Sequence, residues 1–382
     1  MNPQDLIGPF SPLGNPAPFW FITFFKVFGF ILHMIPMNIW YAGMLLVAIF
    51  ATFGRNHSLE LAHRLSRSMP IIVAMGVNLG IVPLLFTQVG YYQFYYPAGI
   101  LMAYAWFSVI VILIFAYYGV YVYSLSVKNN KHTKLALASA WISSIAFIFI
   151  GFLFANNFSL MANINDWIHI YNKTNVAGAA LGTGLNTADP TLIPRWLMMF
   201  GLAITTTAVY IAFDAAFFKK RDTSPLTGSS TSDYKTWAGK FAFAFYTLGM
   251  VLFAVMGSWY IFGALEKSTF DQLSQNSFMY IIFGLTAVSP GLVWIAMLLQ
   301  RKGVKRKVTI FAAILQFVVV TLNAVSRQWV QNLEIFRFKN ISELPVNIQW
   351  SPMILFLLLF VIGLAVVGWM IAKIVAVEKS VA

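Results

Sequence analysis

The hydrophobic residues of this chain fall into long runs that are separated by short polar connections. The runs lie near residues 22–52, 70–96, 98–126, 134–157, 195–218, 238–263, 277–299, 308–328 and 352–377. About 20 apolar residues let an α-helix cross the hydrocarbon core of a bilayer, and a backbone in lipid must satisfy its hydrogen bonds within helices or closed barrels. Each run is far longer than a strand needs. The pattern therefore predicts an all-α fold, a polytopic membrane helical bundle of about nine transmembrane helices.

Two connections are too long to be turns, and we expect functional surface on both. They cover about residues 158–194 and 329–351. A third connection, residues 219–236, contains the polar stretch RDTSPLTGSSTSD and is typical of a linker. We find no internal repeat and no soluble domain. Residues 1–382 are therefore interpreted as a single transmembrane domain.

Composition supports a membrane protein. Hydrophobic residues make up 59% of the chain and charged residues 10%, whereas charged residues are about 25% of a soluble domain. The absence of cysteine excludes disulfides, iron–sulfur clusters and covalent c-type haem attachment. No Walker loop, HExxH motif or catalytic-triad pattern occurs. The first 20 residues lack a basic start, so we expect an ordered or interfacial arm there instead of a cleaved signal peptide.

The net charge of +13 is explained by the side of the membrane on which basic residues gather. Most of the 25 basic residues lie in alternate connections, among them Arg55, Arg64, Arg67, Lys128, Lys131, Lys134, Lys219, Lys220, Arg221, Lys235, Lys240, Arg301, Lys302, Lys305, Arg306 and Lys307. Cytoplasmic loops carry such an excess, which predicts an outside N-terminus and a cytoplasmic C-terminus. The partner of this charge is then the lipid bilayer, and we expect no nucleic-acid partner.

His33 is the candidate for chemistry inside the membrane. Of the five histidines, His57 and His63 fall in the first cytoplasmic connection, and only His33 falls within a predicted span, three residues before Pro36. Ionisable groups in spans are expensive and usually functional, which favours a haem axial ligand or a polar group on a quinol or proton path. The alternative is a histidine that a neighbouring helix satisfies. A haem with two histidine ligands needs a second facing histidine, which this chain does not offer.

Other polar residues in the spans have ordinary explanations as well as functional ones. Asp214 lies near the cytoplasmic edge, where we expect it to pair with nearby lysines. Asn78, Pro83 and Gln88 interrupt the second run. They would line a cavity, or they would serve helix packing and hydrogen bonding between helices.

The eighth run ends on the outside with Arg327, Gln328 and Trp329. An arginine there is either an anchor whose head reaches the interface or a group that holds an anionic ligand. Basic residues are scarce on this side of the predicted topology. The position therefore favours a specific partner for Arg327.

The order of these features resembles cytochrome bd quinol oxidase subunit I, a nine-span protein with an outside N-terminus. In that family the first span carries a haem b ligand histidine shortly before a proline, and FILHMIPMNIWYAG is similar, which implies that His33 is a haem ligand. The fifth span of the family opens on a second haem-ligating histidine. Here TADPTLIPRWLMMFG offers Met198 or Met199 at that point.

The eighth span of the family ends in a Glu-x-x-Arg-Gln-Pro-Trp pattern. The corresponding residues of this chain are Ala324, Arg327, Gln328 and Trp329. The resemblance implies that Arg327 balances a haem propionate, with Gln328 and Trp329 beside the cofactor. The glutamate associated with the oxygen-reducing haem is replaced by Ala324, and Ile281 or Ile282 stands where the family has a ligating methionine.

Two further departures concern the second span and the quinol loop. VNLGIVPLLFTQVGYYQFYY resembles the family's EFQFGTNW segment without its carboxylate. Only about a dozen residues, from Leu265 to Asn276, connect the sixth and seventh spans, so the family's large external quinol loop is absent. The resemblance therefore implies a subunit with few haem sites.

From the resemblance we expect a cytochrome-bd-like subunit of a respiratory-type electron-transfer complex in a bacterial or archaeal cytoplasmic membrane. It would bind at most one or two b-type haems and quinol. Its partners would be other membrane subunits and a periplasmic or membrane cytochrome. Two alternatives stay open: a haem-free quinol-binding anchor or transporter-like subunit, and a complete quinol-dependent oxygen reductase subunit.

Overall fold

A computed structural model describes residues 3–131, 133–218 and 231–379 of the chain. Within these residues, nine helices are long and apolar enough to cross a membrane, which confirms the nine predicted spans. They are α1 (Phe19–Phe53), α2 (His57–Gly90), α4 (Ala103–Lys128), α5 (Lys134–Ala162), α7 (Leu192–Phe217), α8 (Thr231–Ser258), α10 (Ser277–Leu298), α11 (Arg306–Phe336) and α12 (Trp350–Lys379). Most of the predicted linker, residues 219–230, lies outside the described residues.

Shorter elements connect these helices. They are the 3-10 turns η1 (Pro3–Leu6), η2 (Ile164–Asp166) and η5 (Ile341–Glu343), the helices α3 (Tyr92–Leu101), α6 (Trp167–Thr174) and α9 (Lys267–Gln275), the strands β1 (Asn175–Val176) and β2 (Ala179–Ala180), and the π-helical turn η4 (Trp259–Ala264) that continues α8. The two strands form an antiparallel hairpin. The predicted connection 158–194 is therefore a structured segment, and its first residues belong to α5.

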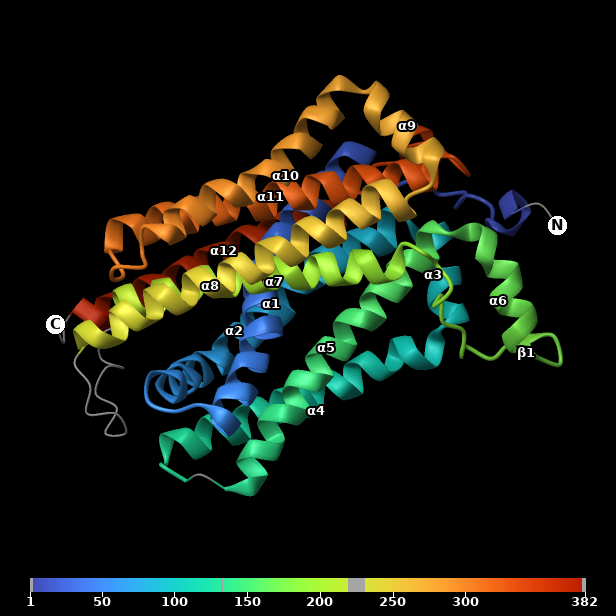
Figure 1. Cartoon of the computed structure of the whole chain (residues 1–382). Helices are drawn as coiled ribbons and strands as arrows, with labels where there is room; N and C mark the ends of the chain where they lie inside the picture. Colours follow the sequence, from blue (N-terminus) through green and yellow to red (C-terminus); the bar gives the residue numbers. More distant parts are fainter. Residues whose placement is uncertain (1–2, 132, 219–230, 380–382) are drawn as a thin grey trace.

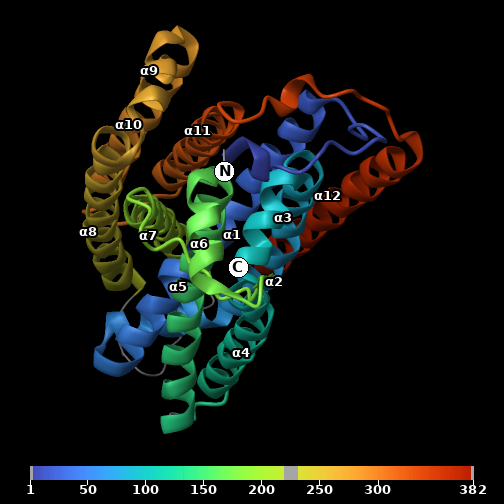
Figure 2. The same cartoon turned by 90° about the vertical axis from the view of Figure 1, so that its right-hand side faces the viewer.

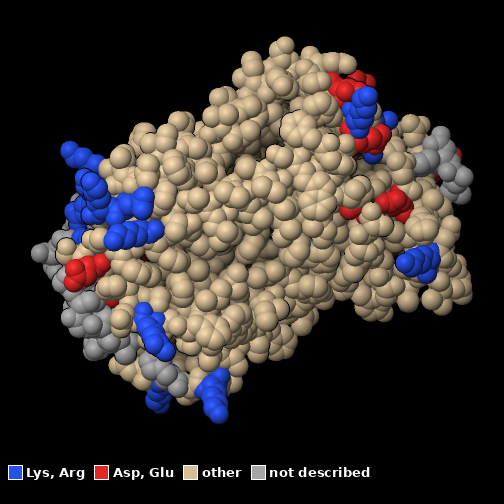
Figure 3. Space-filling view, in the orientation of Figure 1, with Lys and Arg blue, Asp and Glu red and all other residues tan. Residues whose placement is uncertain are grey.

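The long helices run between two ends of the molecule (Figure 1), and the chain termini lie at opposite ends. We call one end the loop end: α1 and α7 begin there, α11 ends there, and α6, α9 and the hairpin lie there. The other is the basic end, where α1 ends and α2 begins. Lys and Arg gather at the basic end (Figure 3), as the charge pattern of the alternate connections predicts.

Interior and peripheral helices differ in burial. Seen from the loop end (Figure 2), α1 lies near the centre, with α12 at one edge and α8 and α10 at the opposite edge. In the most apolar 18-residue stretch of α1, 67% of the residues are buried inside the protein, whereas in that of α12 the share is 0%. The α12 rings of Phe356 and Phe360 contact Phe25 of α1. The residues of α1 are therefore the ones that can meet several neighbouring helices.

Small residues let α7 and α8 pack backbone to backbone. A β-carbon on Gly201 would lie 2.7 Å from the Phe253 nitrogen, and one on Gly249 would lie 2.8 Å from the Gly201 oxygen. Close approach through small residues is the usual way in which membrane helices associate, because lipid offers no hydrophobic gain between helices. Any larger side chain at either glycine would push the two helices apart.

The N-terminal arm is ordered, as expected. The Asn15 nitrogen donates to the Pro345 oxygen at 2.8 Å, and the Asn347 nitrogen donates to the Asn15 oxygen at 2.8 Å. Gln93 donates its Nε2 to the Gly8 oxygen at 2.5 Å. These contacts tie the arm to the connection between α11 and α12 and to α3.

Two predictions about the second span need correction. α2 runs through Pro83 without a break, and the exposed Asn78 donates to the Ala74 oxygen of its own helix. His57 and His63 belong to the first turns of α2 and not to a loop. A membrane helix can absorb a proline when neighbouring helices hold it, which explains the unbroken second span.

Asp214 pairs with Arg64, a partner that the sequence did not indicate. Arg64 of α2 donates its Nε to Asp214 Oδ2 at 2.5 Å, and its Nη2 donates to the Asp214 and Phe218 oxygens at 3.1 Å. The lysines nearest to Asp214 in sequence, Lys219 and Lys220, lie outside the described residues. This buried pair joins α2 to α7 at the basic end.

Candidate functional site

His33 lies on the face of α1 that packs against α2. Its Nδ1 is 2.7 Å from the Gly76 oxygen, and a β-carbon on Gly80 would lie only 2.8 Å from the same nitrogen. The imidazole therefore occupies a place on α2 that only a glycine leaves open. The Trp40 ring meets the imidazole edge to face, with centroids 6.0 Å apart.

The contact with Gly76 fixes the tautomer of His33. A carbonyl oxygen only accepts, so Nδ1 must carry the proton that it shares with the Gly76 oxygen. Nε2 then presents its lone pair when the ring is neutral, and no hydrogen bond to Nε2 is found in the described part of the chain. Metal-ligating histidines commonly donate their other N–H to a carbonyl in this way. The donor set at His33 thus fits one axial ligand of a haem iron.

Arg327 is not at the end of its helix. The predicted eighth span stopped at residue 328, but α11 continues to Phe336, which places Arg327 more than two turns inside the helix. Its guanidinium lies between two rings, 4.4 Å from the centroid of Phe30 and 4.9 Å from that of Phe158. No ion pair found among the described residues includes Arg327.

Phe30 brings His33 and Arg327 to one place. It lies on α1 one turn before His33, and the two ring centroids are 6.5 Å apart. The guanidinium of Arg327 also stacks on the Phe30 ring. The structure therefore joins two residues that are almost 300 positions apart in sequence and that the resemblance had assigned to the same cofactor. Their common surroundings are aromatic rings from α1 and α5.

Gln328 and Trp329 point to other neighbours. Gln328 donates its Nε2 to the Tyr91 hydroxyl at 2.8 Å and to Asn332 Oδ1 at 2.7 Å. The Trp329 ring meets Phe278 of α10 at 5.4 Å. Gln328 therefore belongs to a polar group around Tyr91, and Trp329 belongs to the contact between α10 and α11.

The two candidate methionines pack against apolar parts of the bundle. Met198 packs toward α8, where its Sδ lies 3.5 Å from the place of a β-carbon on Gly257. Met199 is partly buried against the main apolar core. Methionine commonly fills irregular gaps in such cores, and this ordinary role accounts for both contacts.

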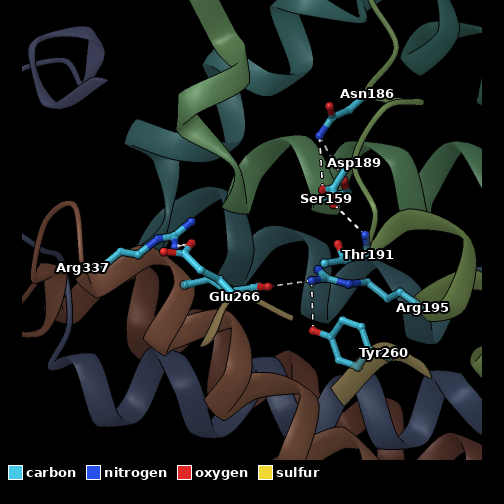
Figure 4. A network of polar contacts seen from close by, with 9 residues as sticks. Ser159, Asn186, Asp189, Thr191, Arg195, Tyr260, Glu266 and Arg337 are labelled. Atoms are coloured by element: carbon cyan, nitrogen blue, oxygen red, sulfur yellow. Dashed lines mark hydrogen bonds and ion pairs between the residues drawn. The ribbon is translucent and has the colours of Figure 1, made fainter. Parts of the chain in front are cut away.

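Sequence reasoning missed a buried ion pair beside this site. Arg195 of α7 donates its Nη2 to Glu334 Oε1 of α11 at 2.7 Å. The same nitrogen donates to the Tyr260 hydroxyl at 3.0 Å (Figure 4). Tyr260 belongs to the π-helical turn, and such turns frequently occur at functional sites. The signal for Glu334 was its spacing of seven residues from Arg327, but we had placed it in a loop.

A second buried group holds the connection before α7 (Figure 4). Asp189 accepts hydrogen bonds from the Ser159 hydroxyl at 2.5 Å and from the Thr191 nitrogen at 2.8 Å, and Asn186 donates to it at 3.3 Å. Burial, together with the nearby carboxylate of Asp189, raises the pKa of Asp166 in the same connection. The negative charge of Asp189 is thus already committed to hydrogen bonds that fix the start of α7.

Comparison with known proteins places the fold but not the chemistry. No family model and no curated protein matches the chain. Among solved structures, a chain of the bd oxidase from Geobacillus thermodenitrificans is similar to it over 96% of this chain and 99% of that chain, with a TM-score of 0.68 and 13% identity. The chain is thus a multi-pass membrane protein with the helical fold of a bd oxidase chain. The distant resemblance found in the sequence is confirmed for the fold.

Proposed function

We propose that this chain is a haem-poor, cytochrome-bd-like membrane subunit of an electron-transfer complex. The observation that carries the proposal is the placement of His33: its Nδ1 is tied to the Gly76 oxygen, its Nε2 is left as a ligand, and Arg327 lies across Phe30 from it. The bd-oxidase fold supports the proposal as context only.

The residues have distinct roles in this proposal. His33 holds the iron of one b-type haem through Nε2, and Gly80 leaves room for the ring. Arg327 holds a propionate, because its planar guanidinium can donate two parallel hydrogen bonds to a carboxylate. When bound, the haem supplies one-electron transfer, and the chain supplies its position and its electrostatic surroundings.

The proposed partners follow from where this site lies. Arg327 belongs to the last third of α11, near the loop end, and α6 and the hairpin cover that end. We place the loop end outside a bacterial or archaeal cytoplasmic membrane, where a periplasmic or membrane cytochrome docks on it, and further membrane subunits complete the complex. Quinol would be the membrane-side electron carrier.

A visible spectrum of the purified protein tests this function. We expect a reduced-minus-oxidised b-type spectrum with about one haem per chain in the wild type, and loss of that haem in His33→Gln. His169→Gln, a histidine of α6, is the matched control and should keep the haem. Protein from haem-sufficient cells that shows no haem absorbance would refute the haem role of His33.

A haem-free quinol-binding anchor is the second candidate, because a cavity of about 170 Å³ lies between α1, α7 and α11. Its lining is apolar except for Thr206, Tyr210 and Gln316, which suits a prenyl tail better than a polar transport substrate. This candidate predicts that quinone co-purifies with the chain and is lost in Gln316→Leu. Oxygen uptake by the isolated chain with quinol would instead favour a complete oxygen reductase.

A further inference from the structure

Lys26 is a buried cation that has no role in the family resemblance or in the proposed binding of haem iron by His33. It lies on α1 one turn before Phe30 and is 6% exposed. Its Nζ donates to Gln331 Oε1 at 2.6 Å and lies 3.8 Å above the centroid of the Tyr91 ring. Both contacts are with neutral groups, so they leave its positive charge uncompensated.

Lys26 and Arg327 lie on neighbouring turns of the contact between α1 and α11. The two helices run in opposite directions: Lys26 meets Gln331, and one turn deeper Phe30 meets Arg327. Four residues of helix rise about 6 Å, so the two cations are roughly one turn apart along this contact. Two negative groups on one molecule can span such a separation.

The buried carboxylates of the loop end are already committed elsewhere. Glu334 pairs with Arg195, and Asp189 accepts from Ser159 and from the start of α7. None of the ion pairs found in the described part of the chain includes Lys26 or Arg327. A buried lysine and a partly buried arginine without a carboxylate are costly in a medium of low dielectric constant, and an anion would offset this cost.

We propose that Lys26 and Arg327 form a two-cation site for the anionic end of a membrane-embedded amphiphile. The haem version rests on the proposed function: the ligand is then the b-type haem at His33, and each cation holds one propionate. The phosphate headgroup of an acidic phospholipid is the other source of an anion, and its one phosphate would lie between the two cations. Arg327 supplies a planar pair of donors, and Lys26 supplies a point charge.

Binding of protohaem and of its dimethyl ester to apoprotein tests the haem version, because the ester lacks both negative charges. We expect the wild type to prefer protohaem, and Lys26→Gln to reduce this preference about tenfold or more, since hydrogen bonds to charged groups are the strong ones. Lys26→Arg should restore the preference, which separates charge from folding. Lys173→Gln, an exposed lysine of α6, should leave it unchanged.

The outcomes separate this site from the proposed function. If the wild type and Lys26→Gln prefer protohaem over its dimethyl ester to the same degree, the role of Lys26 is overturned, while His33 remains a haem ligand. If neither porphyrin binds the wild type, the haem role fails, and phospholipid retention decides. Native mass spectra of the wild type should then show retained phosphatidylglycerol but no phosphatidylcholine, and Lys26→Gln should lose the phosphatidylglycerol. Equal retention of phosphatidylglycerol by the wild type and by Lys26→Gln would overturn the two-cation site.

Discussion

The buried pair of Arg195 and Glu334 allows a stability prediction with a defined magnitude. The side chains are 12% and 9% exposed, and the Nη2 to Oε1 distance is 2.7 Å. Glu334→Ala leaves the guanidinium of Arg195 buried without its carboxylate. Removal of one partner of a buried pair costs about 3–5 kcal/mol, which corresponds to a fall in Tm on the order of 5–10 °C.

A double-mutant cycle measures the pair itself. Arg195→Met leaves the Glu334 carboxylate unpaired, whereas the double variant leaves no buried charge at this place. We expect the double variant to be less destabilised than the sum of the single variants by about 0.5–3 kcal/mol. Thermal unfolding of all four proteins in one detergent checks this. Additive losses would refute the reasoning, because they would mean that the two side chains do not stabilise each other.

A more exposed ion pair at the loop end provides the control for this double-mutant cycle. Arg337 pairs with Glu266, whose side chain is 56% exposed. Exposed pairs contribute about 0–1 kcal/mol because water screens them. Glu266→Ala should therefore change Tm by no more than a degree or two, and a loss as large as that of Glu334→Ala would contradict the assignment of the effect to burial.

Three further predictions concern other parts of the chain. Gly80→Val should displace the His33 ring and abolish the proposed haem spectrum, whereas Gly99→Val, where a β-carbon meets nothing within 4 Å, should not. Arg64→Met should cost about 3–5 kcal/mol in thermal unfolding, because it removes one partner of a buried ion pair between α2 and α7. Burial raises the pKa of Asp166 above its usual 3.8, so the stability contributed by its protonated form is present below pH 3.8 and is lost as pH rises through the raised pKa. Asp166→Asn should therefore raise Tm at pH 7 and lose this advantage below pH 3.8, as Tm measured against pH will show.

The sequence predicted the number of membrane helices well, because each span must be long and apolar to satisfy its backbone in lipid. It predicted helix ends less well. The last turns of α11 contain Gln328, Gln331 and Glu334, whose polarity suggested a loop. These side chains are buried against other helices, and hydropathy alone cannot distinguish a polar face that meets protein from one that meets water.

The candidate site was partly predictable for a related reason. His33 was identified because it is ionisable and lies in the middle of an apolar run, and Arg327 was identified because it follows one. Lys26 was not identified, since a lysine near the start of a span usually reaches the interface. Its burial depends on Tyr91 and Gln331, which come from distant parts of the chain and whose contact no local pattern reveals.

The polar positions of α11 gain a common meaning once the helix is known to continue to Phe336. Its buried polar or charged positions include Gln316, Asn323, Gln331 and Glu334, with Arg327 between them, at steps of seven, four, four and three residues. Steps of three, four and seven keep residues on one face of an α-helix. These polar positions thus share one face of α11, interrupted by the buried Val319 and Val320, from the network around Thr206 to the pair with Arg195. Polar side chains at these positions cost free energy in a membrane protein unless they meet polar partners, and no ion pair found among the described residues includes Arg327. That part of α11 is therefore where a ligand would stabilise the fold most.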